Sequence, residues 1–285
     1  IKKSNLINTD KNYLLCSDTN EKFPILKNKA FCLLPDKKVN EEILLKDIDF
    51  FTRKGKGHSW ANNHWYDLKI NDLIDDTHEP KIVLNIGSGH AQERKKIMDK
   101  GYQVICIDIH PMDGVDVIAD AHFLPFKDNT FDLIVSFEVL EHLKLPWVVI
   151  KEINRVLKDE GKFIGSVAFL KPFHNSFFHM SHHGVIELLK YGNFKIDKIY
   201  GGQNFLSTLF RLLYPLGSSR FSMYIYDKIF YCTIFIRSLL WGLKKNKSPY
   251  KKMIYWDKNH EFSFVDWEYI KNAGSILFSS IKQKY

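Results

Sequence analysis

The sequence predicts an α/β fold in which short apolar strands alternate with helices. Residues 81–86 are largely apolar, Gly87 follows them, and residues 91–100 have a helical composition. Two further apolar stretches, 103–108 and 131–136, have the length of buried strands and end in polar residues. Strands separated by helical segments in this way are typical of βαβ units, so most of the sheet is expected to be parallel.

The turn after the first of these strands contains a pair of glycines, Gly87 and Gly89. Glycine allows the backbone to approach a ligand closely, and the helix that follows offers free N–H groups at its start. About twenty residues later the next strand ends in Asp108. In dinucleotide-binding folds an acid at this place takes the ribose hydroxyls, so the pattern predicts a nucleotide site.

Four features follow one another along the chain: Asn85-x-Gly87-x-Gly89, Asp108, Asp120-Ala121 and the strand 131–136. In this order they resemble the motifs of the class I S-adenosylmethionine-dependent methyltransferases, specifically the methyltransferase type 11-like group. The resemblance covers roughly residues 80–202. It implies a Rossmann-like sheet of seven mostly parallel strands with an antiparallel last strand, which residues 273–282 resemble.

The resemblance also implies S-adenosyl-L-methionine as cofactor and a set of residues that contact it. In the family, an Asp or Glu usually stands where this chain has Asn85, and it helps to hold the cationic amino group of the methionine part. Asn85 keeps a hydrogen-bond acceptor but lacks the charge, and Ala91 replaces the third glycine. The predicted cofactor-binding residues are Asn85, Gly87, Gly89, Asp108, Ile109, Asp120, Ala121 and Ser136.

The first part of the chain is predicted to form two smaller units. Residues 1–52 contain three apolar stretches, which predict a β arm of two or three short strands. This arm faintly resembles zinc-ribbon modules, but Cys16 and Cys32 stand alone, so it is expected to hold no zinc. Residues 53–79 are expected to be a helical segment that covers the cofactor.

The second half continues the α/β pattern and closes the core with residues 263–285. The elements expected after the strand 131–136 are helix 146–157, a turn at 159–161, strand 162–169, helix 184–190 and strand 194–200. The methyltransferase core is therefore assigned to 80–202 and 263–285.

Residues 203–262 are predicted to be a helical insertion before the last strand. Between 203 and 247 it carries seven basic residues and one acid, together with many aromatic side chains. Three roles remain open for these aromatic residues: packing on the core, peripheral contact with an anionic membrane, or a homodimer interface.

Methyl transfer to a hydroxyl acceptor usually requires a base, and the candidates are histidines near the ends of the later strands. His142 and His182 are the predicted catalytic residues, chosen from a group that also includes His174, His179 and His183. The string Glu138-x-x-Glu141-His142 resembles the Mg²⁺ ligands of some O-methyltransferases. The same string occurs in metal-free members, and catalysis is expected to need no metal.

Composition limits the other classes of function. The formal net charge is +8, which permits acidic partners without requiring them, and the four cysteines form no CxxC pair. The chain begins without an apolar leader and has no apolar window of spanning length. A cytoplasmic protein is expected, with peripheral contact at the inner membrane face as an option.

The predicted function is methylation, on the oxygen of a small molecule or of a sugar in a glycan or lipid-linked intermediate. The alternatives are a tRNA or other RNA methyltransferase, which the positive charge favours, and a degenerate cofactor-binding scaffold subunit, which Asn85 favours. The acceptor and the oligomeric state are left open by the sequence.

Overall fold

The computed structural model describes the central α/β core, four short strands that precede it, and the last strand. In numbers, these are residues 6–8, 13–16, 22–26, 29–31, 73–171, 175–202, 228–229, 232–233, 236, 270 and 273–284.

The described elements are, in chain order, β1 (Leu6–Asn8), β2 (Tyr13–Cys16), β3 (Lys22–Leu26), β4 (Lys29–Phe31), β5 (Lys81–Ile86), α3 (Arg94–Met98), β6 (Tyr102–Asp108), β7 (Val117–Ile118), β8 (Phe131–Phe137), the 3₁₀ turn η2 (Leu140–His142), α4 (Pro146–Val156), β9 (Leu157–Ala168), α5 (His182–Tyr191), β10 (Phe194–Gly201) and β11 (Ser275–Lys282).

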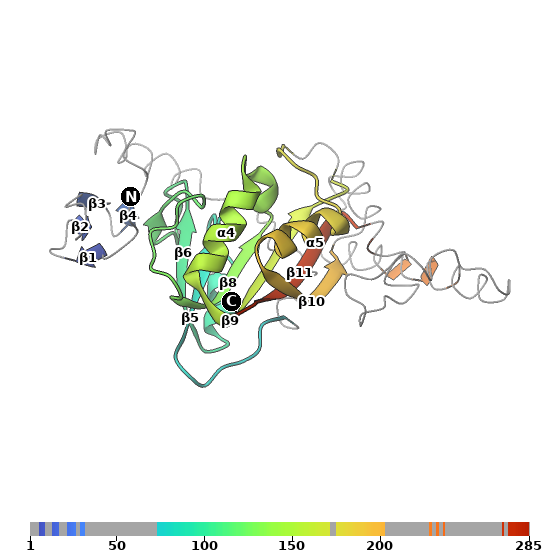
Figure 1. Ribbon diagram of the computed structural model, residues 1–285, viewed down its shortest axis with the longest axis horizontal. Helices are drawn as coiled ribbons and strands as arrows, with labels where there is room; N and C mark the ends of the chain where they lie inside the picture. Colours follow the sequence, from blue (N-terminus) through green and yellow to red (C-terminus); the bar gives the residue numbers. More distant parts are fainter. Residues whose placement is uncertain are drawn as a thin grey trace.

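The core sheet has the order β7-β6-β5-β8-β9-β11-β10 (Figure 1). Strands β5 to β9 run parallel to one another, whereas β11 is antiparallel to both β9 and β10. The predicted Rossmann-like sheet of seven strands with an antiparallel last strand is therefore confirmed. The carboxyl ends of β5 to β9 meet at one edge of the sheet, which we call the carboxyl edge.

The alternation of side chains along β5 divides the core into two layers. Leu84 and Ile86 face the layer formed with α4 and α5, which lie side by side over one face of the sheet (Figure 1). Val83 faces the opposite layer, where it packs with Ile97 of α3. Because both faces are covered by apolar side chains, the strands read as nearly continuous hydrophobic runs in the sequence.

The N-terminal stretch forms four strands where the sequence predicts two or three. β1 to β4 pair as an antiparallel series, and β4 then pairs in parallel with β7 through Ala30–Val117 and Phe31–Ile118. These strands extend the core sheet to eleven strands. The boundary of the arm at residue 52 lies outside the described residues and stays a prediction.

The helix after the glycine turn is shorter than the predicted range 91–100. It spans Arg94–Met98, because Ala91 adopts a φ of 52° and the chain continues in turns before the helix begins. Ala91 therefore takes a backbone conformation that favours glycine.

The predicted turn at 159–161 is a bulge inside a continuous strand. Leu157, expected at the end of the preceding helix, already pairs with Phe131, and pairing then resumes between Leu133 and Lys162. Glu160 has a φ of 62° within this bulge. The extra residues on β9 are accommodated by the left-handed residue rather than by ending the strand.

Several predicted regions fall outside the described residues. Only five residues of the insertion 203–262 are described, and residues 32–72 and His174 are not among the described ones. Among the helices of the described part, none has the length and hydrophobicity needed to cross a bilayer.

Lys282 of β11 is a buried ammonium group that ties the last strand to the start of β9. Its Nζ donates to Asn129 Oδ1 at 2.7 Å and to the Leu157 carbonyl at 2.8 Å, and it lies 3.1 Å from Asp159. We expect Lys282→Met to lower the free energy of unfolding by about 2–4 kcal/mol, because it leaves buried acceptors without a donor.

The matched control is Lys284→Met, since Lys284 makes an exposed ion pair with Glu160 at 3.0 Å. Exposed pairs contribute about 0–1 kcal/mol, so this variant should unfold close to the parent in urea. Equal destabilisation by the two substitutions would contradict the role assigned to Lys282.

Candidate functional site

The glycine turn after β5 is held against the segment that follows β8. Gly87 has a φ of 65°, and a Cβ atom placed on it would lie 2.3 Å from Cγ2 of Val139. Gly89 also has a left-handed φ of 51°, and a Cβ atom placed on it would be in ordinary van der Waals contact with Sδ of Met112, at 3.9 Å. Position 87 therefore requires glycine for both conformation and space.

Asp108, at the end of β6, is fixed to this turn by its carboxylate. Its Oδ2 accepts from the Gly89 N–H at 2.9 Å, and its Oδ1 accepts from the His110 N–H at 3.0 Å. A carboxylate has about four acceptor positions, so capacity remains for ligand hydroxyls. The next residue, Ile109, is 52% exposed and offers an apolar surface beside the acid.

Asn85, on β5 just before the turn, is almost fully buried and has a neutral environment. Its Nδ2 lies 4.0 Å from the Sγ of Cys106 on the adjacent strand. Burial raises the pKa of the Cys106 thiol to about 11, so the thiol carries no charge at neutral pH. The end of β5 is thus uncharged at the place where the family usually has an acid.

The loop after β7 is connected to the loop after β8 through His122. Leu145 N–H donates to Nε2 of this ring at 3.4 Å, which leaves Nδ1 to carry the proton and to donate to Asp120 Oδ1 at 2.6 Å. The His122 N–H donates to the same oxygen at 2.9 Å. Asp120 therefore has a fixed orientation, and the buried Ala121 lies beside it.

Two residues of α4 hold the rest of that loop. The guanidinium of Arg155 donates to the carbonyl oxygens of Leu124 and Phe126 at 2.9 and 2.7 Å. The carboxylate of Glu152 accepts from the Leu124 N–H at 3.0 Å and from Arg155. The loop carrying Asp120 is therefore anchored to the helix layer of the core.

Glu138 directly follows β8 and forms an ion pair with Lys171 near the same edge. Glu138 has a φ of 57°, and its carboxylate accepts from Ser166 Oγ at 3.2 Å and from Lys171 Nζ. Both side chains are largely buried. Lys171 is not among the site residues predicted from the sequence, although its position just after the strand 162–169 indicates that it lies at the carboxyl edge.

The structure separates the three residues of the Glu138-x-x-Glu141-His142 string. Glu138 turns toward Lys171, Glu141 is fully buried and accepts from the Ala168 N–H at 3.1 Å, and His142 is exposed in η2. Among the described residues, no three His, Cys, Asp or Glu side chains are grouped to hold a metal ion. The string does not form one ligand cluster here because only residues 140–142 are helical.

The remaining predicted site residues lie at different depths. Ser136 on β8 is fully buried. His182 is buried at the start of α5, where burial and the neighbouring His183 lower its pKa to about 4. A base with so low a pKa accepts a proton poorly at neutral pH, so of the two predicted histidines the exposed His142 is the better suited.

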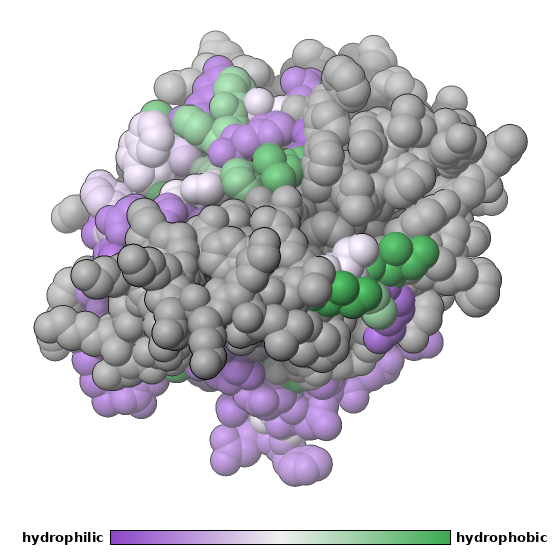
Figure 2. Space-filling model, turned by 90° about the vertical axis from the view of Figure 1, so that its right-hand side faces the viewer, coloured by the Kyte–Doolittle hydropathy of each residue, from purple (hydrophilic) through white to green (hydrophobic). Residues whose placement is uncertain are grey.

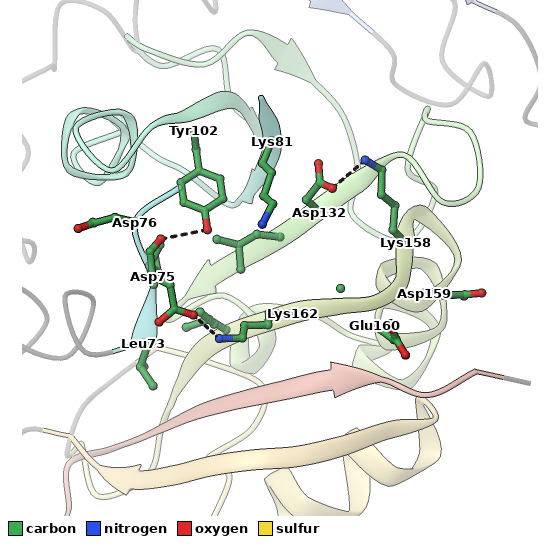
Figure 3. A pocket seen from close by; sticks show the side chains of 14 residues that line it. Leu73, Asp75, Asp76, Lys81, Tyr102, Asp132, Lys158, Asp159, Glu160 and Lys162 are labelled. Carbon is green, nitrogen blue, oxygen red and sulfur yellow. Dashed lines mark hydrogen bonds and ion pairs between the residues drawn. The ribbon is translucent and has the colours of Figure 1, made fainter. Parts of the chain in front are cut away.

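A polar cavity of about 260 Å³ lies at the opposite edge, where the parallel strands begin (Figure 3). Lys162 Nζ lies 2.6 Å from Asp75 Oδ2, and this hydrogen bond lowers the pKa of Asp75. Lys158 pairs with Asp132 at 2.7 Å. None of the predicted site residues lines this cavity, so the candidate site is the carboxyl edge.

Comparison with known proteins identifies the central part of the chain. Residues 84–165 match the family described as a methyltransferase domain. A stretch of 148 residues is 28% identical to an uncharacterized protein of Methanocaldococcus jannaschii and covers 49% of this chain and 59% of that protein. A stretch of 121 residues is 30% identical to an uncharacterized methyltransferase of Mycobacterium leprae and covers 36% of this chain and 45% of that protein.

A shorter stretch of 58 residues is 47% identical to the mitochondrial arginine-hydroxylase NDUFAF5 of Homo sapiens, covering 19% of this chain and 15% of that protein. The chain thus spans less than two thirds of the length of each of these relatives. One solved structure, a complex of the Haloferax volcanii Trm112 methyltransferase activator with a methyltransferase, resembles the fold. It has a TM-score of 0.50 at 15% identity and covers 84% of this chain and 97% of that one.

His182 generates a prediction for the pH dependence of stability. Its folded pKa of about 4 lies below the ordinary value near 6.5, so protonation favours the unfolded chain. The stability linked to a neutral His182 is complete above about pH 6.5 and is lost as the pH falls toward 4. Between pH 7 and 5 we expect the parent to lose about 1–2 kcal/mol more than His182→Asn does.

Urea unfolding of the two proteins at pH 7, 6 and 5 measures this difference directly. The other histidines titrate in both proteins, so their effect on the free energy of unfolding is removed when the variant's value is subtracted from the parent's. Parallel losses in the two proteins would show that His182 is accessible to protons in the folded state.

Proposed function

We infer the function from the central domain: residues 84–165 form a methyltransferase domain of the class I S-adenosylmethionine-dependent type, and we propose that the chain transfers a methyl group from that cofactor. The observation that carries the proposal is the fixed contact between Asp108 and the glycine turn, at 2.9 Å from the Gly89 N–H. Bound S-adenosylmethionine supplies an electrophilic methyl group on its sulfonium.

Five residues of the carboxyl edge then have a role in binding that cofactor. Asp108 takes the ribose hydroxyls, and Ile109 packs against the adenine. The orientation of Asp120 by His122 suits a hydrogen bond to the adenine edge, since both hydrogen bonds from His122 go to Oδ1 and leave Oδ2 for the ligand. The turn at Gly87 lets the methionine part approach the backbone closely, and Asn85 accepts from its amino group without providing charge.

We propose that the acceptor is a hydroxyl of a small molecule or of a sugar in a glycan or lipid-linked intermediate. The ion pair of Glu138 and Lys171 supports a polar acceptor, because it places two charged hydrogen-bonding groups beside the glycine turn. Glu138 adopts a left-handed φ, which is costly for a residue with a side chain and is often found at functional sites. We propose that His142, which is exposed in η2, takes the proton of the hydroxyl.

An RNA acceptor is the second candidate, favoured by the net charge of +8. An assay with a labelled methyl donor distinguishes the two acceptors. The protein is incubated either with glycan and lipid extracts or with total RNA, and the fraction that gains the label identifies the acceptor. Mass spectrometry of the product also shows whether a methyl group or an oxygen has been added, which separates this chemistry from that named for the hydroxylase relative.

Cofactor binding is tested by Asp108→Ala. The loss of charged acceptor oxygens for the ribose should weaken S-adenosylmethionine binding by roughly 1.5–3 kcal/mol in calorimetry. Asp113→Ala is the matched control, an exposed aspartate on the loop after β6. Asn85→Asp is the companion variant and should tighten binding by adding a charge at the amino group.

Unchanged affinity in Asp108→Ala would remove the ribose assignment. If Asn85→Asp fails to tighten binding, Asn85 does not lie at the amino group.

Catalysis is tested by His142→Ala. Loss of a general base should lower kcat by about 10²–10⁴-fold and leave cofactor affinity unchanged. His78→Ala, an exposed histidine in the segment before β5, should keep full activity. A His142→Ala enzyme as fast as the parent would assign proton removal to another group.

A further inference from the structure

Large hydrophobic side chains are exposed near the carboxyl edge, in the segment after η2 and in the loop that is hydrogen-bonded to η2. Leu145, Trp147 and Phe177 are 45%, 42% and 60% exposed, and Phe178 is half-buried beside them. Hydrophobic side chains also reach the surface among hydrophilic ones on the side that carries β10 and β11 (Figure 2). We call Leu145, Trp147, Phe177 and Phe178 the aromatic rim.

The backbone beneath the rim is firmly held. The N–H groups of Phe177 and Phe178 both donate to the carbonyl of Glu141, at 2.9 and 3.1 Å, and Met180 N–H donates to the carbonyl of Ala168 at 2.9 Å. The rings of Trp147 and Phe178 are arranged edge to face with centroids 6.3 Å apart. These exposed side chains are thus displayed by ordered backbone and are not part of either core layer.

The surroundings of the rim are basic. Lys144 Nζ lies 6.0 Å from the centroid of the Phe177 ring. The exposed Lys151 follows Trp147 by one helical turn on α4, and its Nζ lies 4.7 Å from the centroid of the Tyr191 ring on the neighbouring helix α5. Within residues 142–151 and the described residues 175–181 there is no exposed Asp or Glu. The segments that carry the rim are therefore basic, and the nearby Asp120 is paired with His122, whose ring accepts from the Leu145 N–H.

We propose that the aromatic rim, with Lys144 and Lys151, docks this protein onto an anionic lipid bilayer. Tryptophan and phenylalanine enter the boundary between headgroups and acyl chains, and lysines beside them attract anionic lipid. Leu145 is aliphatic and offers nothing to stack on a base, and two lysines neutralise few phosphates, so lipid fits better than RNA. Since the rim adjoins the proposed methyl-transfer site, docking would bring a lipid-borne acceptor to it; only this last step rests on the proposed function.

The test is co-sedimentation of the full chain, without cofactor or acceptor, with vesicles of phosphatidylcholine alone or mixed with phosphatidylglycerol. We expect binding to the anionic vesicles only, weakened by salt. The double variant Trp147→Ala/Phe177→Ala should bind at least about tenfold more weakly, because it removes two large apolar side chains from the bilayer. Met98→Ala, which truncates a 53% exposed methionine on α3, should bind like the parent.

A second variant, Lys144→Glu/Lys151→Glu, replaces only exposed side chains and should also weaken binding, even if the aromatic variant folds poorly. Calorimetric binding of S-adenosylmethionine by each variant reports that its cofactor site is intact, so a failure of docking is distinguished from a failure of the proposed function. Full binding by both variants, no binding of the parent to anionic vesicles, or rim-dependent binding to RNA instead of vesicles would each overturn the proposal.

Discussion

The organisation of the carboxyl edge depends on the contact between Gly87 and Val139. A side chain at position 87 would meet Cγ2 of Val139 at 2.3 Å, so the turn after β5 and the segment after β8 can lie this close only with glycine. The left-handed turn also presents the Gly89 N–H to Asp108 on the neighbouring strand. The absence of a side chain at position 87 therefore allows the carboxyl ends of three neighbouring strands, β6, β5 and β8, to lie close together.

Charged groups at this edge are held by specific partners before any ligand arrives. Asp108 accepts from two backbone N–H groups, Asp120 is oriented by His122, and Glu138 pairs with Lys171. Such prior orientation lowers the reorganisation needed when a polar ligand binds. At the opposite edge, by contrast, the two ion pairs formed by Lys158 and Lys162 lie at a cavity that contains none of the predicted site residues (Figure 3).

The strands and the glycine turn were predictable because their signals are local. Apolar runs such as 82–84 need burial on both faces of a sheet. The glycine pair after them indicates a nucleotide site only together with Asp108 at the end of the next strand. The pairing of Glu138 with Lys171 was not predictable, because it joins residues 33 positions apart and depends on how β8 and β9 lie. The left-handed φ of Glu138 and Glu160 has no local signal either, since non-glycine residues adopt it only under tertiary constraint.

The most direct test of this account is a crystal structure of the chain with S-adenosylhomocysteine. We expect the ribose hydroxyls on the carboxylate of Asp108, the adenine between Ile109 and Asp120, and the amino group at Asn85. A ligand in the cavity beside Lys81 and Tyr102, or one whose ribose makes no contact with Asp108, would contradict it.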